Sequence, residues 1–280
     1  MPTYLDDQFN WDDPGAASVH DELPLWSAPF GLMLLEHIPI KSRMTVLDIG
    51  FGTGFPLLEL AQRLGTSSTV YGIDPWKAAF QRVTEKMTRL NITNVKLVEG
   101  DASAMNFPDD NFHLIVSNTG INNFENVEAV FSECFRTMKP GGSIALTTNP
   151  KGHMKEFYHV LKDTMTQLNL ENLFDKLEAH IAHRLSVETV CGLLERAEFK
   201  IAHTHQQAFV MRFADGSAFL NHSFIRHGFL GAWKALFPED KMEQVFTRLE
   251  TNLNRLAKKE KVFKVTIPAA YIEAVKPKAL

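Results

Sequence analysis

A turn that contains three glycines follows the first buried-looking strand of the chain, in the segment VLDIGFGTGFP (residues 46–56). Glycine adopts positive φ angles and lets a ligand approach the main chain closely. Turns of this kind, between a buried strand and a helix, bind nucleotide-containing ligands in many α/β proteins. Gly50, Gly52 and Gly54 therefore predict a small-ligand site, and the residues around them decide which ligand fits.

The turn disfavours a phosphate. A Walker P-loop requires a lysine after its last glycine, and the turn has none. A dinucleotide fingerprint fits Gly50 and Gly52, but its third glycine position is occupied by Phe55. Asp48 also points toward the turn, and two like charges about 5 Å apart repel by about 3 kcal/mol at an effective dielectric near 20. The segment favours a nucleoside that carries an amino acid moiety with its ammonium.

Two more carboxylates are expected near the glycine turn, at the carboxyl ends of the next two predicted strands. Asp74 closes the second strand, where a carboxylate can accept both hydroxyls of a ribose. Asp101 closes the third strand, where it can accept an adenine amino group while the backbone N–H of Ala102 donates to a ring nitrogen. Because open α/β sheets bind ligands at the carboxyl ends of adjacent strands, we expect these groups to form one site.

The elements that position these residues alternate between strands and helices. Short apolar and β-branched runs predict strands at Thr45–Gly50, Thr69–Asp74, Val95–Glu99, Phe112–Asn118 and Ser143–Thr148. Apolar residues at helical spacing predict helices at Phe55–Leu64, Pro75–Leu90 and Asn126–Met138. This alternation is typical of βαβ units, so the first half predicts a doubly wound α/β domain with a mostly parallel sheet.

The second half adds helices to this sheet. We expect two helices within 151–185, a capped helix at Ser186–Phe199, a strand near 200–211, helices at 215–236 and 239–257, and a strand at 265–275. The predicted parts are an N-terminal helical and lid segment (1–40), the α/β core (41–150), a helical insertion (151–185), a core helix and strand (186–211), a second helical insertion (212–262), and a terminal core strand and tail (263–280). We expect the two insertions to form a lid over the strand ends.

Composition narrows the class of protein. The 280 residues are 45% hydrophobic and 22% charged, with a net charge of −4, so no general basic surface favours nucleic acid. Two cysteines make neither a disulfide framework nor a metal site. The acidic N-terminus lacks a signal pattern, and the apolar tract Phe30–Ile40 is too short for a membrane span. We expect a cytoplasmic soluble protein of unknown oligomeric state.

Five motifs in order carry a family resemblance: VLDIGFGTG, GID, EGDA, FPDDNFHLIVSN and MKPGG. The series resembles class I S-adenosylmethionine-dependent methyltransferases, in the small-molecule branch that includes the ubiquinone/menaquinone-biosynthesis methyltransferases. It covers about residues 20–149, with weaker agreement at 186–211 and at the terminal AAYIEAVKP. The resemblance implies a seven-stranded Rossmann-like sheet, S-adenosyl-L-methionine as cofactor and S-adenosyl-L-homocysteine as product.

The resemblance also assigns cofactor contacts. It implies that the turn of Gly50, Gly52 and Gly54 approaches the methionine part of the cofactor, that Asp48 acts on its ammonium side, and that Asn118 lies near the methionine and sulfonium. It also implies that Asp74 binds the ribose and that Pro75 and Trp76 pack beside the adenine. Asp101 and Ala102 would contact the adenine edge. Relatives commonly carry Cys where Phe51 stands. Its ring either faces the cation of the cofactor or packs under the turn. Arsenite methyltransferases resemble this core, but the scattered cysteines disfavour arsenic as substrate.

The acceptor side is less defined. Ile225, Phe229 and Trp233 recur at helical spacing, which predicts either core packing or an apolar wall for an aromatic acceptor. Trp26 lies in a segment that resembles the family's leading segment, which folds over the cofactor, and Asn122 is a further candidate beside the acceptor. No catalytic base is evident. Six histidines of the insertions are candidates or simple packing residues: His153, His159, His180, His183, His222 and His227.

The expected function is transfer of a methyl group to a small, apolar or aromatic acceptor. The turn at 118–125 lacks the N-P-P-Y sequence of enzymes that methylate amino groups of DNA or protein glutamine, so nucleic acid is not the expected partner. A nicotinamide-dependent oxidoreductase is an alternative that rests on Gly50, Gly52 and Asp74. A protein that binds the cofactor without catalysis is another.

Overall fold

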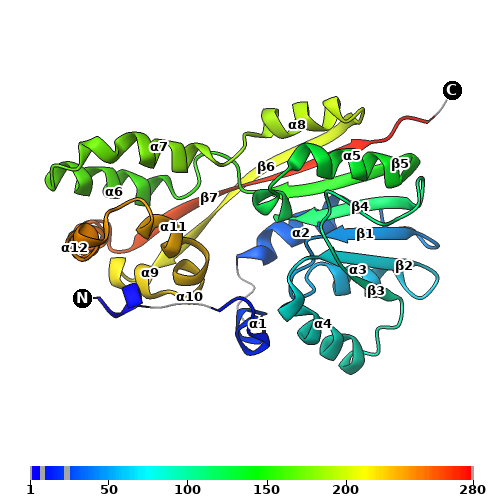
Figure 1. Cartoon of the computed structure of the whole chain (residues 1–280), viewed down its shortest axis with the longest axis horizontal. Coiled ribbons are helices and arrows are strands. Elements are labelled where there is room, and N and C mark those ends of the chain that lie inside the picture. The colour runs from blue at the N-terminus through cyan, green and yellow to red at the C-terminus, as the bar shows by residue number, and fades with distance from the viewer. Residues whose placement is uncertain (1, 7–9, 22–25, 279–280) are drawn as a thin grey trace. The chain divides into compact units, whose positions relative to one another are not determined.

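The computed structural model describes residues 2–6, 10–21 and 26–278 of the chain. These residues divide into two compact units (Figure 1). The sheet unit contains Asn10–Asn149, Leu185–Gln207 and Ala269–Leu280. The helical unit contains Pro150–Arg184 and Ala208–Pro268, together with residues from the start of the chain.

A seven-stranded sheet organises the sheet unit, in the order β3-β2-β1-β4-β5-β7-β6. The strands are β1 (Thr45–Ile49), β2 (Thr69–Asp74), β3 (Val95–Glu99), β4 (Phe112–Asn118), β5 (Met138–Thr148), β6 (Lys200–Phe213) and β7 (Phe263–Val275). β1 to β5 pair in parallel, and β7 pairs antiparallel with β5. The doubly wound sheet predicted from the sequence is confirmed.

Helices cover both faces of the sheet. In Figure 1, α5 (Val127–Thr137) and α8 (Val187–Arg196) lie above the sheet, and α4 (Lys77–Arg89) lies at its lower side. The helix α2 (Ser27–His37) contacts β4 and β5, and α3 (Leu57–Leu64) contacts β2. The short helix α1 (Pro14–Asp21) contacts α4. A continuous core joins the strands to α5 and α8, and buries Leu47, Ile115, Phe131 and Leu194. The burial of both faces explains the consecutive apolar residues Val46 and Leu47 in β1 and Leu114, Ile115 and Val116 in β4.

The parallel strands bring the predicted site residues to one edge. Asp48, Asp74 and Asn118 stand at or next to the carboxyl ends of β1, β2 and β4. The register aligns Asp48 with Gly72 of β2 and with Val116 of β4. The side chains that sequence reasoning grouped by strand position therefore lie at the same edge of the sheet.

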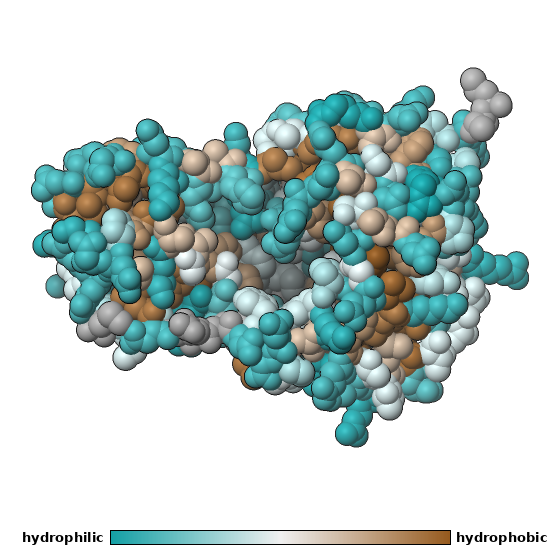
Figure 2. All heavy atoms as spheres, viewed as in Figure 1, coloured by the Kyte–Doolittle hydropathy of each residue, from teal (hydrophilic) through white to brown (hydrophobic). Residues whose placement is uncertain are grey.

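The helical unit has an aromatic interior. Its elements are η1 (Thr3–Asp6), α6 (Lys155–Gln167), η3 (Glu171–Leu173), α7 (Phe174–Ala182), α9 (Gly216–Asn221), α10 (Ser223–Ile225), a π-helix (Arg226–Leu230), α11 (Gly231–Lys234) and α12 (Glu239–Glu260). Trp233 is fully buried and stacks on Phe157 with ring centroids 4.0 Å apart. On the face drawn in Figure 2, hydrophilic residues cover much of these helices.

Two element predictions were wrong in detail. β5 begins at Met138 rather than Ser143, because Met138 already pairs with Phe112 before a register shift. The predicted helix 215–236 is interrupted, because His222 is extended (φ −63°, ψ 128°) and a π-helix follows. Both insertions belong to the helical unit, while the lid role and the finer domain boundaries stay predictions. Within the described ranges, no helix combines the length and apolar character needed to cross a membrane.

Candidate functional site

The glycine turn after β1 is open on one side. Gly50, Gly52 and Gly54 have φ angles of 74°, 52° and 101°. A Cβ on Gly54 would meet Leu58 and Val83 at 3.2–3.3 Å, so this glycine is needed for packing. A Cβ on Gly52 would meet nothing within 4 Å. The turn is thus closed toward the protein at Gly54 and accessible at Gly52.

Asp74 holds the turn against the end of β2. The backbone N–H of Gly52 donates to Asp74 Oδ2 at 2.8 Å, and that of Trp76 donates to Oδ1 at 2.7 Å. Burial raises the pKa of Asp74, and these two amide bonds oppose the rise. Each carboxylate oxygen has two lone pairs, so each can accept one further hydrogen bond. Asp74 can therefore position the turn and still bind a diol.

Asp48 is the least satisfied polar group of the site. Its side chain is 0% exposed, and neither carboxyl oxygen has a hydrogen-bond partner among the described residues. Burial and the charge of Asp74 raise the pKa of Asp48 to about 8, which the nearby Leu57 amide only partly offsets. Leaving a buried carboxyl without partners costs free energy. A cationic ligand at the turn would remove this cost, so the residues fit a ligand with an ammonium group.

The adenine side predicted from the sequence lies on the loops after β2 and β3. Trp76 follows Asp74, and its ring is partly exposed. Ala102 is buried, and the exposed Asp101 accepts a hydrogen bond from Ser103 N–H at 2.8 Å. Pro75 is exposed. The carboxylate of Asp101 and part of Trp76 are therefore accessible on these loops.

Two asparagine side chains at and after the end of β4 form hydrogen bonds with neighbouring segments. Asn118 accepts a hydrogen bond from the Thr147 hydroxyl at 2.7 Å and donates to the Ser27 carbonyl at 3.2 Å. Asn122 donates to Asn149 at 2.8 Å and accepts from the Thr148 hydroxyl at 2.7 Å. Both asparagines are therefore held in fixed orientations beside the strand ends.

The structure shows where the side chain of Phe51 packs. Its side chain is 1% exposed and lies against Phe80, with ring centroids 5.1 Å apart. A Cβ on Gly72 would come within 2.7 Å of the ring, so Gly72 makes room for it. The ring of Phe51 packs under the turn, while a contact of this residue with a cofactor stays a prediction.

Asp21 of the N-terminal segment contacts α4 and the glycine turn, and sequence reasoning missed this residue. Asp21 of α1 accepts hydrogen bonds from Arg82 Nε at 2.8 Å and from Lys86 Nζ at 2.7 Å. Burial alone would raise the pKa of Asp21, but the bonds from Lys86, Arg82 and the Thr53 hydroxyl of the glycine turn lower it below its ordinary value. The spacing of Arg82 and Lys86 on one helix face was visible in the sequence, but nothing pointed to their partner.

An aromatic cluster accompanies this ion pair. The rings of Trp11 and Trp76 lie 5.3 Å apart, and His20 packs against both. The indole N–H of Trp76 donates to the Trp11 carbonyl at 2.6 Å. Residues before α2 therefore help to orient the predicted adenine neighbour. Trp26, the aromatic residue that the sequence singled out there, lies against Phe30 instead, with ring centroids 6.0 Å apart.

Phe229 and Trp233 belong to the interior of the helical unit. Both are buried, and their rings stack with centroids 5.7 Å apart. Their packing role is thus observed, and an acceptor contact stays a prediction. Among the residues that the structure describes, no group of three side chains is arranged to hold a metal ion.

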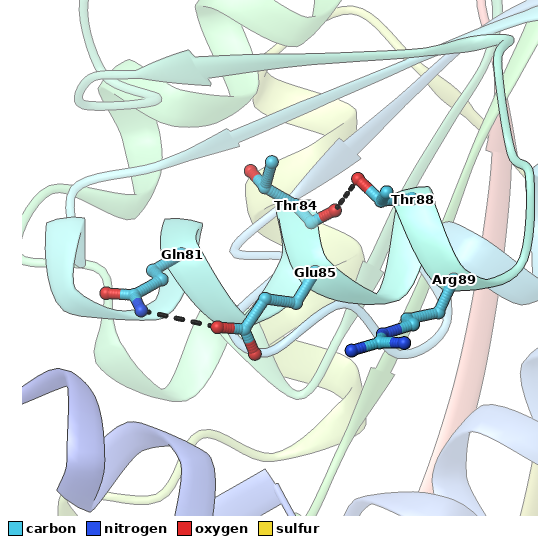
Figure 3. A pocket seen from close by; sticks show the side chains of 5 residues that line it. All are labelled: Gln81, Thr84, Glu85, Thr88 and Arg89. Carbon is cyan, nitrogen blue, oxygen red and sulfur yellow. Dashed lines mark hydrogen bonds between the residues drawn. The ribbon is translucent and has the colours of Figure 1, made fainter.

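A surface hollow lies along α4. Figure 3 shows that one face of this helix lines it, where Gln81 donates to Glu85 at 3.3 Å. The other lining residues are Thr84, Thr88 and Arg89. α4 starts beside Asp74 and runs back along the sheet, so this half of the helix leads away from the strand ends. The hollow offers no cluster of convergent groups.

Comparisons with known proteins agree with this geometry. A family described as "Methyltransferase domain" matches residues 40–222. The demethylmenaquinone methyltransferase of Geobacillus sp. (strain WCH70) is 31% identical over 110 residues, which are 39% of this chain and 47% of that protein. The matched region spans about half the length of this curated relative.

Solved structures share the fold at low identity. A Bacillus halodurans protein described as a candidate methyltransferase superposes with a TM-score of 0.59 at 20% identity, covering 89% of this chain and 99% of that one. A SAM-dependent methyltransferase from Aquifex aeolicus gives 0.53 at 21% identity, covering 69% and 91%. Because the family match extends over more than half of the 280 residues and includes the glycine turn and both aspartates, the chain belongs to the methyltransferase domain family, with the class I fold.

Proposed function

We propose that this protein transfers a methyl group from S-adenosyl-L-methionine to a small-molecule acceptor. The observation that carries the proposal is Asp48, a fully buried carboxyl with no hydrogen-bond partner among the residues that the structure describes, next to a glycine turn that is open at Gly52. The cofactor's methionine part has an ammonium group, which would satisfy this carboxyl. The family match and the cofactor named for the Aquifex aeolicus relative support the same choice.

The remaining cofactor contacts follow from the strand ends. Asp74 would accept the ribose hydroxyls with the lone pairs that Gly52 and Trp76 leave available. The face of Trp76 would pack beside the adenine, while Asp101 and the main chain of Ala102 would contact its edge. Asn118, already oriented by Thr147 and Ser27, would border the methionine part.

The bound cofactor supplies an electrophilic methyl group on a sulfonium. The chain's own task is to align the acceptor with this methyl and to keep water away. Alignment of reacting groups can supply about 7–11 kcal/mol of a barrier. The fixed orientations of Asn118 and Asn122 at the strand ends suit such positioning, because neither amide is free to rotate without breaking two hydrogen bonds.

For the acceptor we propose a small, apolar or aromatic compound. The aromatic interior around Phe229 and Trp233 supports this, since small-molecule sites are mostly apolar with few polar groups. The Geobacillus relative is named for demethylmenaquinone, which is consistent with the same chemical class. Trp26 and Asn122 are the candidate contacts from the sheet unit. Nucleic acid is not the partner we propose.

Calorimetric titration tests the proposal. S-Adenosyl-L-homocysteine should bind, while NAD and NADP should not, because an ammonium group favours ionisation of Asp48 whereas a pyrophosphate opposes it, and because Phe55 occupies the third fingerprint position. Binding of a nicotinamide cofactor alone would establish the oxidoreductase alternative. Transfer of label from methyl-labelled cofactor to an acceptor panel then separates an enzyme from a protein that only binds the cofactor.

A further inference from the structure

Arg136, in the last turn of α5, binds the loop that connects β3 to β4. Its Nη2 donates to the Met105 carbonyl at 2.9 Å, and its Nη1 donates to the Phe107 carbonyl at 2.8 Å and to Asp109 Oδ1 at 2.7 Å. Its Nε and Nη2 also donate to Glu133, at 2.8 and 2.7 Å. A guanidinium has five N–H donors, and these contacts use all of them. One side chain therefore holds the β3–β4 loop at three successive positions.

Glu133 completes this attachment. Its Oε2 accepts a hydrogen bond from the Met105 amide at 2.8 Å, so the two main-chain groups of Met105 are bound, one by Glu133 and one by Arg136. The hydrogen bonds from Arg136 lower the pKa of Glu133, which keeps this carboxylate ionised at neutral pH. Bidentate pairs of this kind fix geometry as well as adding energy. We call Glu133 and Arg136 the α5 clamp.

A short turn joins the clamped part of the loop to the predicted adenine contacts. The Ala104 amide donates to the Asp101 carbonyl at 3.2 Å, and the Ser103 amide donates to Asp101 Oδ1 at 2.8 Å. Ala102 and Met105 are both buried in the core of the sheet unit. Because the turn is closed by its own hydrogen bonds and Met105 is fixed from α5, a shift at Met105 would also move Asp101 and Ala102.

The other end of the loop has a separate attachment. Lys276 donates to Asp110 Oδ1 and to the carbonyls of Phe135 and Met138, each at 2.8 Å. These bonds hold the end of the loop that enters β4. The α5 clamp instead binds the part that leads back toward Asp101. The two attachments can therefore be removed one at a time, and their effects on a ligand at Asp101 can be compared.

The edge of an adenine ring is recognised by the direction of its hydrogen bonds. The amino group donates and the adjacent ring nitrogen accepts, so a carboxylate and a main-chain N–H match this edge. Hypoxanthine has a carbonyl and a ring N–H at the same positions, which reverses both directions. A site with fixed polar groups rejects the reversed pattern, because its own groups would be left unpaired in the complex. Asp101 and Ala102 can reject it in this way if the loop cannot adjust.

We propose that Arg136 and Glu133, the α5 clamp, are positioning residues for adenine recognition. By fixing Met105, the clamp holds Asp101 and the main chain of Ala102 where they match adenine and reject a base with the reversed pattern. The inference rests on the proposed function, which supplies the adenosine part of the ligand. The clamp acts through Met105 and does not itself contact the cofactor, so its effect is on the choice of base.

The test compares S-adenosyl-L-homocysteine with S-inosyl-L-homocysteine, which differ at the base edge. Calorimetric titration, with competition for the weaker ligand, gives the ratio of their dissociation constants. Wild type should prefer the adenosine ligand by about a hundredfold or more. In Arg136→Gln this ratio should fall by about tenfold or more, because a loop that can adjust no longer penalises the reversed pattern. Arg136→Lys should lower the ratio too, since lysine keeps the charge but cannot form the fork of hydrogen bonds.

Lys276→Met is the matched control, because it removes the three hydrogen bonds at the other end of the same loop. Its ratio should stay within about twofold of the wild-type ratio. Hydrogen exchange of the ligand-free proteins then connects the ratio to the loop. The Met105 amide, which bonds to Glu133, should exchange faster in Arg136→Gln than in wild type, while the amides of β3 should exchange at unchanged rates.

A purely structural role for Arg136 would weaken both ligands alike. An unchanged ratio in the Arg136 variants, an equal fall in Lys276→Met, or unchanged exchange of the Met105 amide would therefore overturn the proposal. If Arg136→Gln does not fold, Arg136→Lys decides. A wild-type protein that binds S-adenosyl-L-homocysteine but does not distinguish the two bases would refute this inference and leave the proposed function standing. A wild-type protein that binds neither ligand would refute both.

Discussion

Asp74 raises the pKa of Asp48, and the two carboxyls differ in one respect that defines the site. Asp74 accepts two backbone hydrogen bonds, from Gly52 and Trp76, while neither oxygen of Asp48 has a hydrogen-bond partner within the described part of the chain. One carboxyl therefore builds the turn, and we propose that the other meets the ammonium group of the cofactor. Their separate roles lead to different expected outcomes on substitution.

Asp48→Asn should change how stability depends on pH. The pKa of Asp48 is about 8 in the folded protein and near 3.8 when the chain is unfolded. The folded state thus binds the proton more tightly, so its contribution is fully present below about pH 4 and is lost as the pH rises toward 8. The difference in unfolding free energy between variant and wild type should grow by about 1.4 kcal/mol per pH unit across this window.

Urea unfolding of the ligand-free protein at pH 5, 6, 7 and 8 measures this difference. Asp101→Asn is the control, because Asp101 is exposed on the loop after the neighbouring strand. Parallel pH profiles for wild type and Asp48→Asn would show that Asp48 is ionised throughout, contrary to the expectation.

Cofactor binding should release a proton from Asp48. An ammonium group beside the carboxyl favours its ionised form, so affinity for S-adenosyl-L-homocysteine should rise between pH 6 and pH 7.5, below the range near 7.7–8.0 where an α-amino group loses its own charge. Calorimetry in buffers with different heats of ionisation counts the protons released. In Asp48→Asn the release should vanish and the affinity should fall. Release that persists in the variant would assign the proton to another group.

Asp74→Ala should weaken both the ligand complex and the turn. Removing two charge-assisted bonds to ribose should cost about 2–4 kcal/mol of binding, allowing for partial replacement by water. Loss of the bonds to Gly52 and Trp76 should also lower the stability of the ligand-free protein. Titration and thermal unfolding together separate the two effects. Normal affinity in a less stable variant would place the ribose elsewhere.

The contact between α1 and α4 should depend on Asp21. Its side chain is 12% exposed and pairs with both Arg82 and Lys86, so Asp21→Asn should cost about 1–3 kcal/mol of unfolding free energy. The stabilisation is present above the unfolded pKa near 3.8 and is lost as the pH falls through the lower folded value. Glu85→Gln removes a more exposed partner of Arg82 at 3.8 Å and should cost less than about 1 kcal/mol. An equal loss of unfolding free energy in the two variants would show that Asp21 stabilises the contact between α1 and α4 no more than an exposed ion pair does.

The parts of the fold that follow from local patterns were predictable. The strand that ends at Asp48 and the helix after Gly54 follow from apolar periodicity and glycine chemistry, and the parallel topology then brings Asp48 and Asp74 to one edge. The contact of Asp21 with Arg82 joins segments 61 positions apart and leaves no local pattern. The contacts of the Tyr158 hydroxyl with His180 and Trp233 could not be predicted for the same reason, because each residue alone fits a packing role in its own helix.

Trp233→Phe should separate acceptor function from cofactor binding. A phenylalanine keeps an aromatic ring against Phe157 but removes the N–H that bonds to Tyr158. Because Trp233 belongs to the helical unit, and the groups expected to hold the cofactor belong to the sheet unit, affinity for S-adenosyl-L-homocysteine should stay within about threefold, or about 0.7 kcal/mol. Turnover or acceptor affinity should fall at least tenfold, about 1.4 kcal/mol.

Unfolding is the confounding effect in this experiment, since replacing a buried aromatic ring leaves a cavity. Melting curves with and without S-adenosyl-L-homocysteine must therefore accompany the kinetics. Phe246→Leu is a matched control, because Phe246 is also fully buried in the helical unit but lies on α12, where it packs against Phe237. A comparable loss of turnover in both variants at equal stability would reduce Trp233 to a core residue. Normal turnover in a stable Trp233→Phe protein would do the same, and the acceptor contacts would then have to be sought at Trp26 and Asn122.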